Sequence, residues 1–149
     1  MNLIKSINQY NGDNVFFCEP IKNNIMTDGR FIRIIYSNNL FTLNCVYIYI
    51  TLQHNIITKY FNKYKCDFDI NLHKNEISKI KNIEEELLKK ANIINKNPQF
   101  KIAEKLMNGN IKIFADNIDC ISQTFLLKIS GIWETEHEYG VTYKFIHTE

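Results

Sequence analysis

The spacing of apolar residues changes along this chain, and that change limits the folds that it can adopt. Residues 30–37 alternate in a period of two, as do 125–132 and 139–146 on either side of a polar connection at 134–138, which is typical of β-strands. Residues 40–52 are rich in β-branched and aromatic residues, which also favours a strand. Between these ranges apolar residues recur at spacings of three and four, which predicts one helix. The stripe consists of Ile77, Ile80, Ile83, Leu87, Leu88, Ala91 and Ile94. One helix between two groups of strands predicts a mainly β fold.

The N-terminal strands are predicted as a hairpin. After a short apolar run from Val15 to Cys18, a turn signal at Asp28-Gly29 precedes a strand from Arg30 to Ser37. The turn Ser37-Asn38-Asn39 leads into a long second strand, Leu40 to Leu52. Ile32, Ile34 and Tyr36 share one face of the first strand, and Val46, Ile48, Ile50 and Leu52 share one face of the second.

The rest of the chain completes the predicted order β-β-β-α-β-β-β. The helix is expected to begin after an N-cap at Asn75 and to end before Pro98. A short helical turn at Lys101 to Met107 and a strand at Ile111 to Ala115 follow. The final hairpin alternates from residue 125 to 146. A sheet of this size needs its edges closed or covered, so we expect a single domain, 1–149, folded as an OB-like Greek-key β-barrel with one helix.

The composition indicates where the protein is located more than which reaction or ligand it serves. The chain has 149 residues and a net charge of only +2, so a nucleic-acid contact would depend on a local patch. Its richness in Ile, Asn and Lys indicates an AT-rich genome, such as that of a virus or plasmid. Four scattered cysteines without a C-x-x-C pair predict reduced thiols. With neither a secretory signal nor a membrane-spanning run expected, the predicted location is the cytoplasm, here a host cytoplasm.

Motifs for catalysis are missing from the sequence. It has no phosphate-binding G-x-x-x-x-G-K-[ST] loop, no G-x-S-x-G elbow and no H-E-x-x-H pair. The sharpest enzyme candidate is the segment Glu134, Glu136, His137 and Glu138, whose side chains could hold Mg²⁺ or Mn²⁺ for phosphodiester cleavage. A solvated hairpin tip explains the same residues more simply. We therefore predict no catalytic residue, no metal and no cofactor.

A pattern of aromatic and basic residues favours binding instead. Tyr47 and Tyr49 lie two positions apart, so both rings project from one face of a strand. If the alternate residues form the core, these rings point outward, where bases stack on rings and phosphates pair with cations. Plain cross-strand packing, or a helix covering this face, would explain the same pattern. The predicted nucleic-acid-binding set is Arg30, Phe31, Arg33, Tyr47, Tyr49, Lys128, Trp133 and Lys144.

Two segments carry a family resemblance. They are EPIKNNIMTDGRFIRIIYS…FTLNCVYIYITL, from Glu19 to Leu52, and LLKISGIWETEHEYGVTYKFI, from Leu126 to Ile146. Both resemble OB-fold single-stranded DNA-binding proteins of large cytoplasmic DNA viruses and of yeast cytoplasmic linear plasmids. The resemblance implies an OB-like fold and sequence-tolerant binding of single-stranded DNA during replication. The acidic tail that many such proteins use to recruit replication enzymes has no counterpart here, so recruitment by a tail is not expected.

Three functions therefore remain open at this point. The first is a non-enzymatic single-stranded DNA-binding protein, and the second is an interaction subunit of a replication or transcription complex without DNA affinity of its own. The third is a small metal-dependent nuclease. The sequence does not choose between DNA and RNA. It also leaves open whether replication proteins are partners and whether the chain forms a homo-oligomer.

Overall fold

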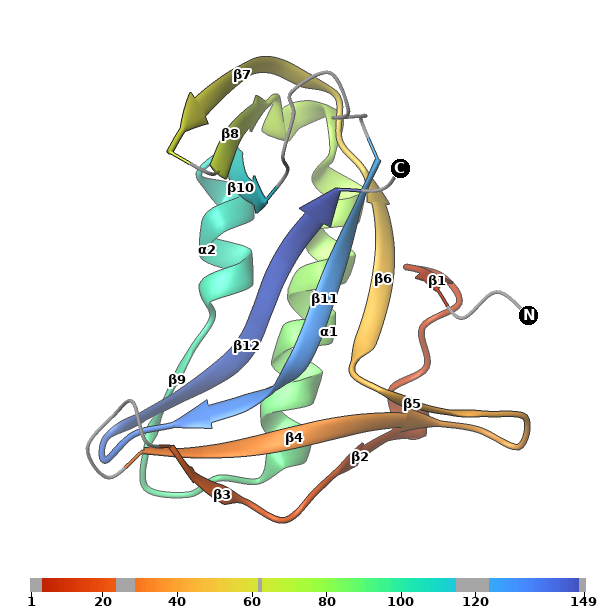
Figure 1. The fold of residues 1–149 in the computed structure, drawn as a ribbon, viewed down its shortest axis with the longest axis vertical. Coiled ribbons are helices and arrows are strands. Elements are labelled where there is room, and N and C mark those ends of the chain that lie inside the picture. Colours follow the sequence, from red (N-terminus) through yellow and green to blue (C-terminus); the bar gives the residue numbers. More distant parts are fainter. Residues whose placement is uncertain (1–3, 24–28, 62, 115–123, 148–149) are drawn as a thin grey trace.

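The alternating segments near both ends form strands, and the apolar stripe forms a helix (Figure 1). The structure is a computed structural model, and it describes residues 4–23, 29–61, 63–114 and 124–147. The described helices are α1, Lys74–Ala91, and α2, Lys101–Met107, with 3-10 turns at Gly12–Asn14 and Ile70–Leu72. The described strands are β1 Lys5–Ser6, β2 Val15–Phe17, β3 Ile21–Asn23, β4 Gly29–Ser37, β5 Thr42–Asn44, β6 Val46–Thr51, β7 His54–Tyr60, β8 Lys63–Phe68, β9 Asn97–Gln99, β10 Asn110–Phe114, β11 Thr124–Glu134 and β12 Glu138–His147.

The prediction of a mainly β fold is confirmed, but the expectation of one helix is wrong. The helical turn foreseen from Lys101 to Met107 is a second helix, α2. Neither described helix is long and apolar enough to cross a membrane. The turn predicted at Asp28 and the cysteine Cys120 lie outside the described residues.

The strand predicted from Leu40 to Leu52 is interrupted at Cys45. This residue has a φ of 73°, in the left-handed region that side chains other than glycine rarely adopt. Before it, β5 pairs with β4, and after it, β6 pairs with β11. The break therefore moves the chain from one neighbour to another. Of the two faces of this strand, the one that carries Val46, Ile48 and Ile50 is the core face, since all three are buried.

The hairpin of β11 and β12 forms the middle of the sheet. One edge of β11 pairs with β12, while its other edge pairs first with β6 and then with β4. The register slips between Ile129 and Gly131, which marks a β-bulge. Glycine inside a strand is a usual place for a bulge. Figure 1 shows β11 and β12 running side by side through the centre of the fold.

Two strands before the helix, β7 and β8, were not predicted. They extend the sheet along the path β1-β6-β11-β12-β10-β8-β7. Within the described residues the two ends of this path do not pair with each other, so the sheet is mixed and unclosed. The closed barrel expected from the sequence is therefore not found there.

Both helices pack against the same side of β12 (Figure 1). The stripe of α1 lies in the core, where Ile77, Ile80 and Leu87 are buried with the inward residues of the strands. The helix ends differ from the prediction. His73, not Asn75, precedes the first turn, and Asn92 in the left-handed conformation ends the helix before Pro98 is reached. Ile94 consequently lies outside α1 and is exposed.

Candidate functional site

The face of the sheet turned away from the helices carries the two tyrosines. In the pairing of β6 with β11, Tyr47 lies opposite Lys128 and Tyr49 opposite Leu126. Their neighbours Ile48 and Ile50 point the other way and are buried in the core. Since side chains alternate along a strand, both tyrosines project from the opposite face. We call it the outer face, and Tyr49 is 46% exposed there.

The adjacent strands bring further predicted residues to the outer face. On β4, Phe31 lies opposite Trp133 and Arg33 opposite Gly131. On β12, Lys144 lies opposite Lys128. Phe31, Tyr47 and Trp133 are half-buried, while Arg33 and Lys144 are exposed. The register thus brings together seven of the eight predicted residues: Phe31, Arg33, Tyr47, Tyr49, Lys128, Trp133 and Lys144.

The bulge in β11 makes this arrangement possible. Strict alternation from Lys128 would place Trp133 on the helix side of the sheet. The extra residue between Ile129 and Gly131 reverses the alternation, so Trp133 and Lys128 share the outer face. The same reversal keeps Ile132 in the core. Without it, the tryptophan and the lysine would lie on opposite faces.

Two glycines receive the large rings of this face, and the sequence prediction did not include them. A Cβ atom at Gly140 would lie 2.7 Å from Cζ2 of Trp133, so the indole lies directly on the β12 backbone. A Cβ atom at Gly131 would lie 2.8 Å from Cζ of Phe31. One side of the indole is therefore taken by the sheet, and a base could stack only on the other. The signal in the sequence was a glycine in each strand of the final hairpin, of which Gly140 lies opposite Trp133.

A lysine lies beside the tyrosines. The Lys128 Nζ atom is 6.0 Å from the centroid of the Tyr47 ring, within the range of a cation–π contact. An ammonium at the edge of a stacking surface is well placed for a phosphate, because the bases and phosphates of one strand are covalently linked. This part of the outer face can therefore offer a ring and a cation to one nucleotide.

Arg30 is the predicted residue that the structure places elsewhere. It lies opposite Glu134 in the register of β4 and β11. Counting in steps of two along these strands, Arg30 and Glu134 are on the same face as the core residues Ile32 and Ile132. Its Nε and Nη2 atoms donate to Oε2 of Glu134 at 3.0 and 2.8 Å. Its charge is thus balanced by a carboxylate, and Arg30 does not join the other cations of the outer face.

Glu134 is buried, which differs from the solvated hairpin tip predicted from the sequence. Its residue is only 3% exposed, and Lys96 Nζ donates to Oε1 at 2.6 Å. Burial alone would raise the pKa of Glu134, but the hydrogen bonds from Lys96 and Arg30 outweigh it and lower the pKa below the ordinary 4.5. The carboxylate is therefore a structural anion, with both oxygens engaged.

Acidification is expected to weaken the fold through Glu134. Because its pKa is lowered on folding, its contribution is present above the ordinary value of 4.5 and is lost as the pH falls through the folded pKa. Glu134→Gln should cost about 1–3 kcal/mol at pH 7, and this difference should shrink as the pH falls below about 4.5. Urea unfolding at several pH values measures both. Glu136→Gln, at an exposed position, is the control, and equal stability of Glu134→Gln and wild type at pH 7 would contradict the assignment.

The rest of the hairpin tip offers little for metal chemistry. His137 and Glu136 are 80% and 71% exposed, with 3.8 Å between Nε2 and Oε2. In the part of the chain that the structure describes, no three His, Cys, Asp or Glu side chains gather as metal ligands would. Glu134, the buried member of the segment, is held by two cations. The nuclease hypothesis therefore has no support from this geometry.

Comparisons with known proteins give no relative from which a role could be transferred. No protein-family model matches the chain, and neither a curated protein nor a solved structure is detectably similar to it.

Proposed function

We propose that this chain binds single-stranded nucleic acid without strong sequence preference, and that its ligand is single-stranded DNA during replication of an AT-rich viral or plasmid genome in a host cytoplasm. One observation carries the proposal. The strand register gathers four aromatic rings and three cationic side chains on the face opposite the helices. Rings with neighbouring cations are what a flexible strand of stacked bases and phosphates requires.

In this proposal the tyrosines stack bases and the neighbouring lysine binds a phosphate. Tyr49, the most accessible of the site rings, and Tyr47 beside it stack successive bases. Lys128 lies at the ring of Tyr47 and pairs with the phosphate of the same nucleotide. The predicted OB-like Greek-key relationship remains a prediction, and the binding proposal does not depend on it, because register and not barrel closure places these side chains.

Replacing both tyrosines tests the proposal directly. Stacking is worth about 1–3 kcal/mol per base, so Tyr47→Ala with Tyr49→Ala should weaken binding of a thymidine oligomer at least about tenfold. Binding is measured by quenching of Trp133 fluorescence and by anisotropy of a labelled oligomer, at low and then moderate salt. Trp133 is the single tryptophan of the chain, so its signal reports one place.

A matched control separates stacking from a general loss of aromatic surface. Phe100→Ala removes a ring of comparable exposure, 38%, next to α2 and away from the outer face. This variant should bind as the wild type does. Unchanged affinity of the folded double tyrosine variant would refute the stacking role. Absence of any salt-dependent binding by the wild type would refute the function and point to a protein partner.

A further inference from the structure

Four lysines lie in one row across four adjacent strands of the sheet. Lys65 of β8 lies directly opposite Lys112 of β10, and Lys144 of β12 lies directly opposite Lys128 of β11. The two pairs are joined because Ile113 pairs with Phe145, which makes Lys112 and Lys144 neighbours on β10 and β12. Paired strands are about 4.8 Å apart, so the two lysines of each directly opposite pair are close neighbours. Beyond Lys128, the next residue in the row is Tyr47.

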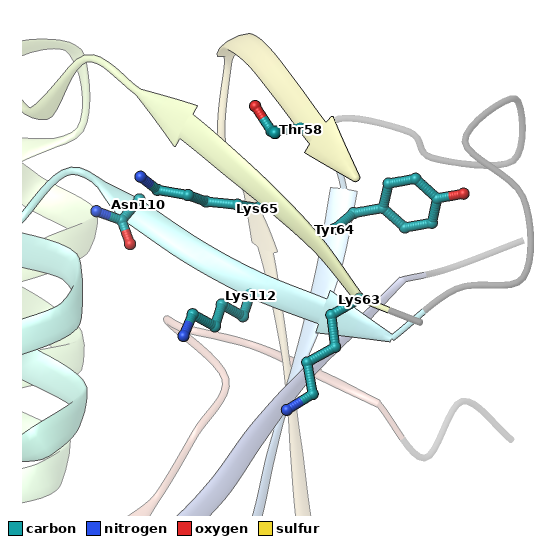
Figure 2. A pocket seen from close by; sticks show the side chains of 6 residues that line it. All are labelled: Thr58, Lys63, Tyr64, Lys65, Asn110 and Lys112. Atoms are coloured by element: carbon teal, nitrogen blue, oxygen red, sulfur yellow. The ribbon is translucent and has the colours of Figure 1, made fainter. Parts of the chain in front are cut away.

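The row lies on the face opposite the core. Tyr64, Cys66, Ile111 and Ile113 alternate with these lysines on β8 and β10 and are buried. Figure 2 shows the side chains of Lys65 and Lys112 projecting from the two strands away from Tyr64. The outer face that carries the aromatic rings thus continues across β12 onto β10 and β8.

Placing lysines opposite each other has a cost for the fold. Like charges directly across a strand pair repel, and here two such pairs adjoin. Lys65 forms an ion pair with Asp67 of the same strand, at 3.9 Å between exposed groups, and such a pair is weak. A row of repelling cations gains stability when a chain of anions lies along it.

Two adjoining pockets extend the cationic surface around the row. One is lined by Lys63, Lys65 and Lys112 together with polar side chains (Figure 2). The other lies where β10 departs from β12 and receives Lys105 from α2. They share Lys63 and Lys112, and the described residues that line them include no carboxylate. Among the described residues, a phosphate entering either pocket would meet lysines together with polar and apolar groups.

We infer that the lysine row, Lys65, Lys112, Lys144 and Lys128, binds successive phosphates of one nucleic-acid strand, which crosses the sheet from β6 to β8. The inference rests on the proposed function and adds the path of the strand and its extension beyond the aromatic rings. Continuity with Tyr47 favours a nucleic acid over an acidic protein, because the row ends at a stacking surface with a cation beside its ring.

Stability provides the first test, without any ligand. Lys112→Gln relieves the repulsion with Lys65 and Lys144, so its Tm at low salt should rise by about 1–3 °C above wild type, and the gain should vanish in high salt. Lys81→Gln, at an exposed position of α1, removes the same charge away from the row and should leave Tm unchanged. A lowered Tm of Lys112→Gln at low salt would show that its partners are anions and would overturn the inference.

Binding of a thymidine oligomer provides the second test. Lys65→Gln with Lys112→Gln should weaken binding about tenfold at low salt and reduce the slope of log affinity against log salt by about 1.4, or 0.7 for each lost phosphate contact. The control is Lys81→Gln with Lys89→Gln, which lowers the net charge equally from the exposed side of α1. Its slope should match that of the wild type.

The outcomes separate this inference from the proposed function. If the wild type binds and the tyrosine variant is weakened, but the Lys65 and Lys112 variant equals its charge control, the path across β10 and β8 is wrong while the function stands. If the wild type binds no oligomer, both fail. If polyglutamate of equal length binds as tightly as the oligomer, the row is a general surface for polyanions, and its assignment to phosphates is overturned.

Discussion

Gly131→Ala is expected to destabilise the fold by about 3 kcal/mol. A Cβ atom at this position would lie 2.2 Å from the carbonyl oxygen and 3.0 Å from the carbonyl carbon of Ile32, both in the backbone of β4. That backbone cannot simply retreat, since β4 also pairs with β3 on its other edge. Relief requires β4 and β11 to separate, and overpacking of this kind costs about 1–3 kcal/mol or more. Urea unfolding at neutral pH measures the loss.

Gly140→Ala is the matched control for this prediction. The three atoms nearest to its Cβ would all be ring atoms of Trp133, at 2.7 to 2.9 Å, and a side chain can turn away where a backbone cannot. We expect a smaller loss of stability than for Gly131→Ala, together with a shift in Trp133 fluorescence emission, because the indole would move away from the β12 backbone. If Gly131→Ala were as stable as the wild type, the close approach of β4 to the bulge would be incorrect. The register that brings Phe31 and Arg33 to the outer face would then also be in doubt.

Faces of single strands were predictable because alternation is local. A spacing of two alone placed Ile32 and Ile34 on one face of their strand and Ile48 on one face of the next, and all three are buried. The same alternation is present in β8, where Tyr64, Cys66 and Phe68 are buried between charged residues. The sequence also predicted that the outward tyrosines would be accompanied by Lys128 and Lys144.

Relations between distant strands could not be predicted in the same way. The lysine row depends on which strands are neighbours and in which register, and residues 65, 112, 128 and 144 are far apart along the chain. The break at Cys45 needs a left-handed backbone that a non-glycine residue adopts only when its surroundings impose it. Arg30 was predicted as a phosphate ligand because it flanks Phe31, and its partner Glu134 lies 104 residues away, beyond the reach of any local pattern. Barrel closure also depends on which distant strands pair, and within the described residues the two ends of the sheet do not pair with each other.

Glu84 connects the two helices through a fully buried carboxylate. It projects from α1, and its Oε2 and Oε1 atoms accept hydrogen bonds from the backbone N–H groups of Ile102 and Ala103, at 2.9 and 3.0 Å. These N–H groups lie in the first turn of α2 and have no partner within that helix. Burial raises the pKa of Glu84, and the two donors offset only part of that rise. The glutamate on α1 thus serves as a cap for α2.

Glu84→Ala is expected to cost about 3 kcal/mol, because two buried N–H groups lose their acceptors and a cavity remains. Glu84→Gln keeps one acceptor oxygen and should lose less. Urea unfolding gives the free energies, and hydrogen exchange at the first turn of α2 shows whether the loss is centred there. Glu85→Ala, at the next and exposed position of α1, should change stability by less than about 0.5 kcal/mol.

Glu84→Leu decides between the cap and simple filling of space. Leucine restores most of the lost volume but accepts no hydrogen bond, so the N–H groups of Ile102 and Ala103 remain buried without partners. We therefore expect Glu84→Leu to stay well below the wild type in stability and to leave the first turn of α2 exchanging rapidly. Wild-type stability of Glu84→Leu would mean that packing, and not the carboxylate, holds α2 against α1. The position of Lys105 of α2, which lines the pocket beside β10, would then depend on helix packing and not on the Glu84 cap.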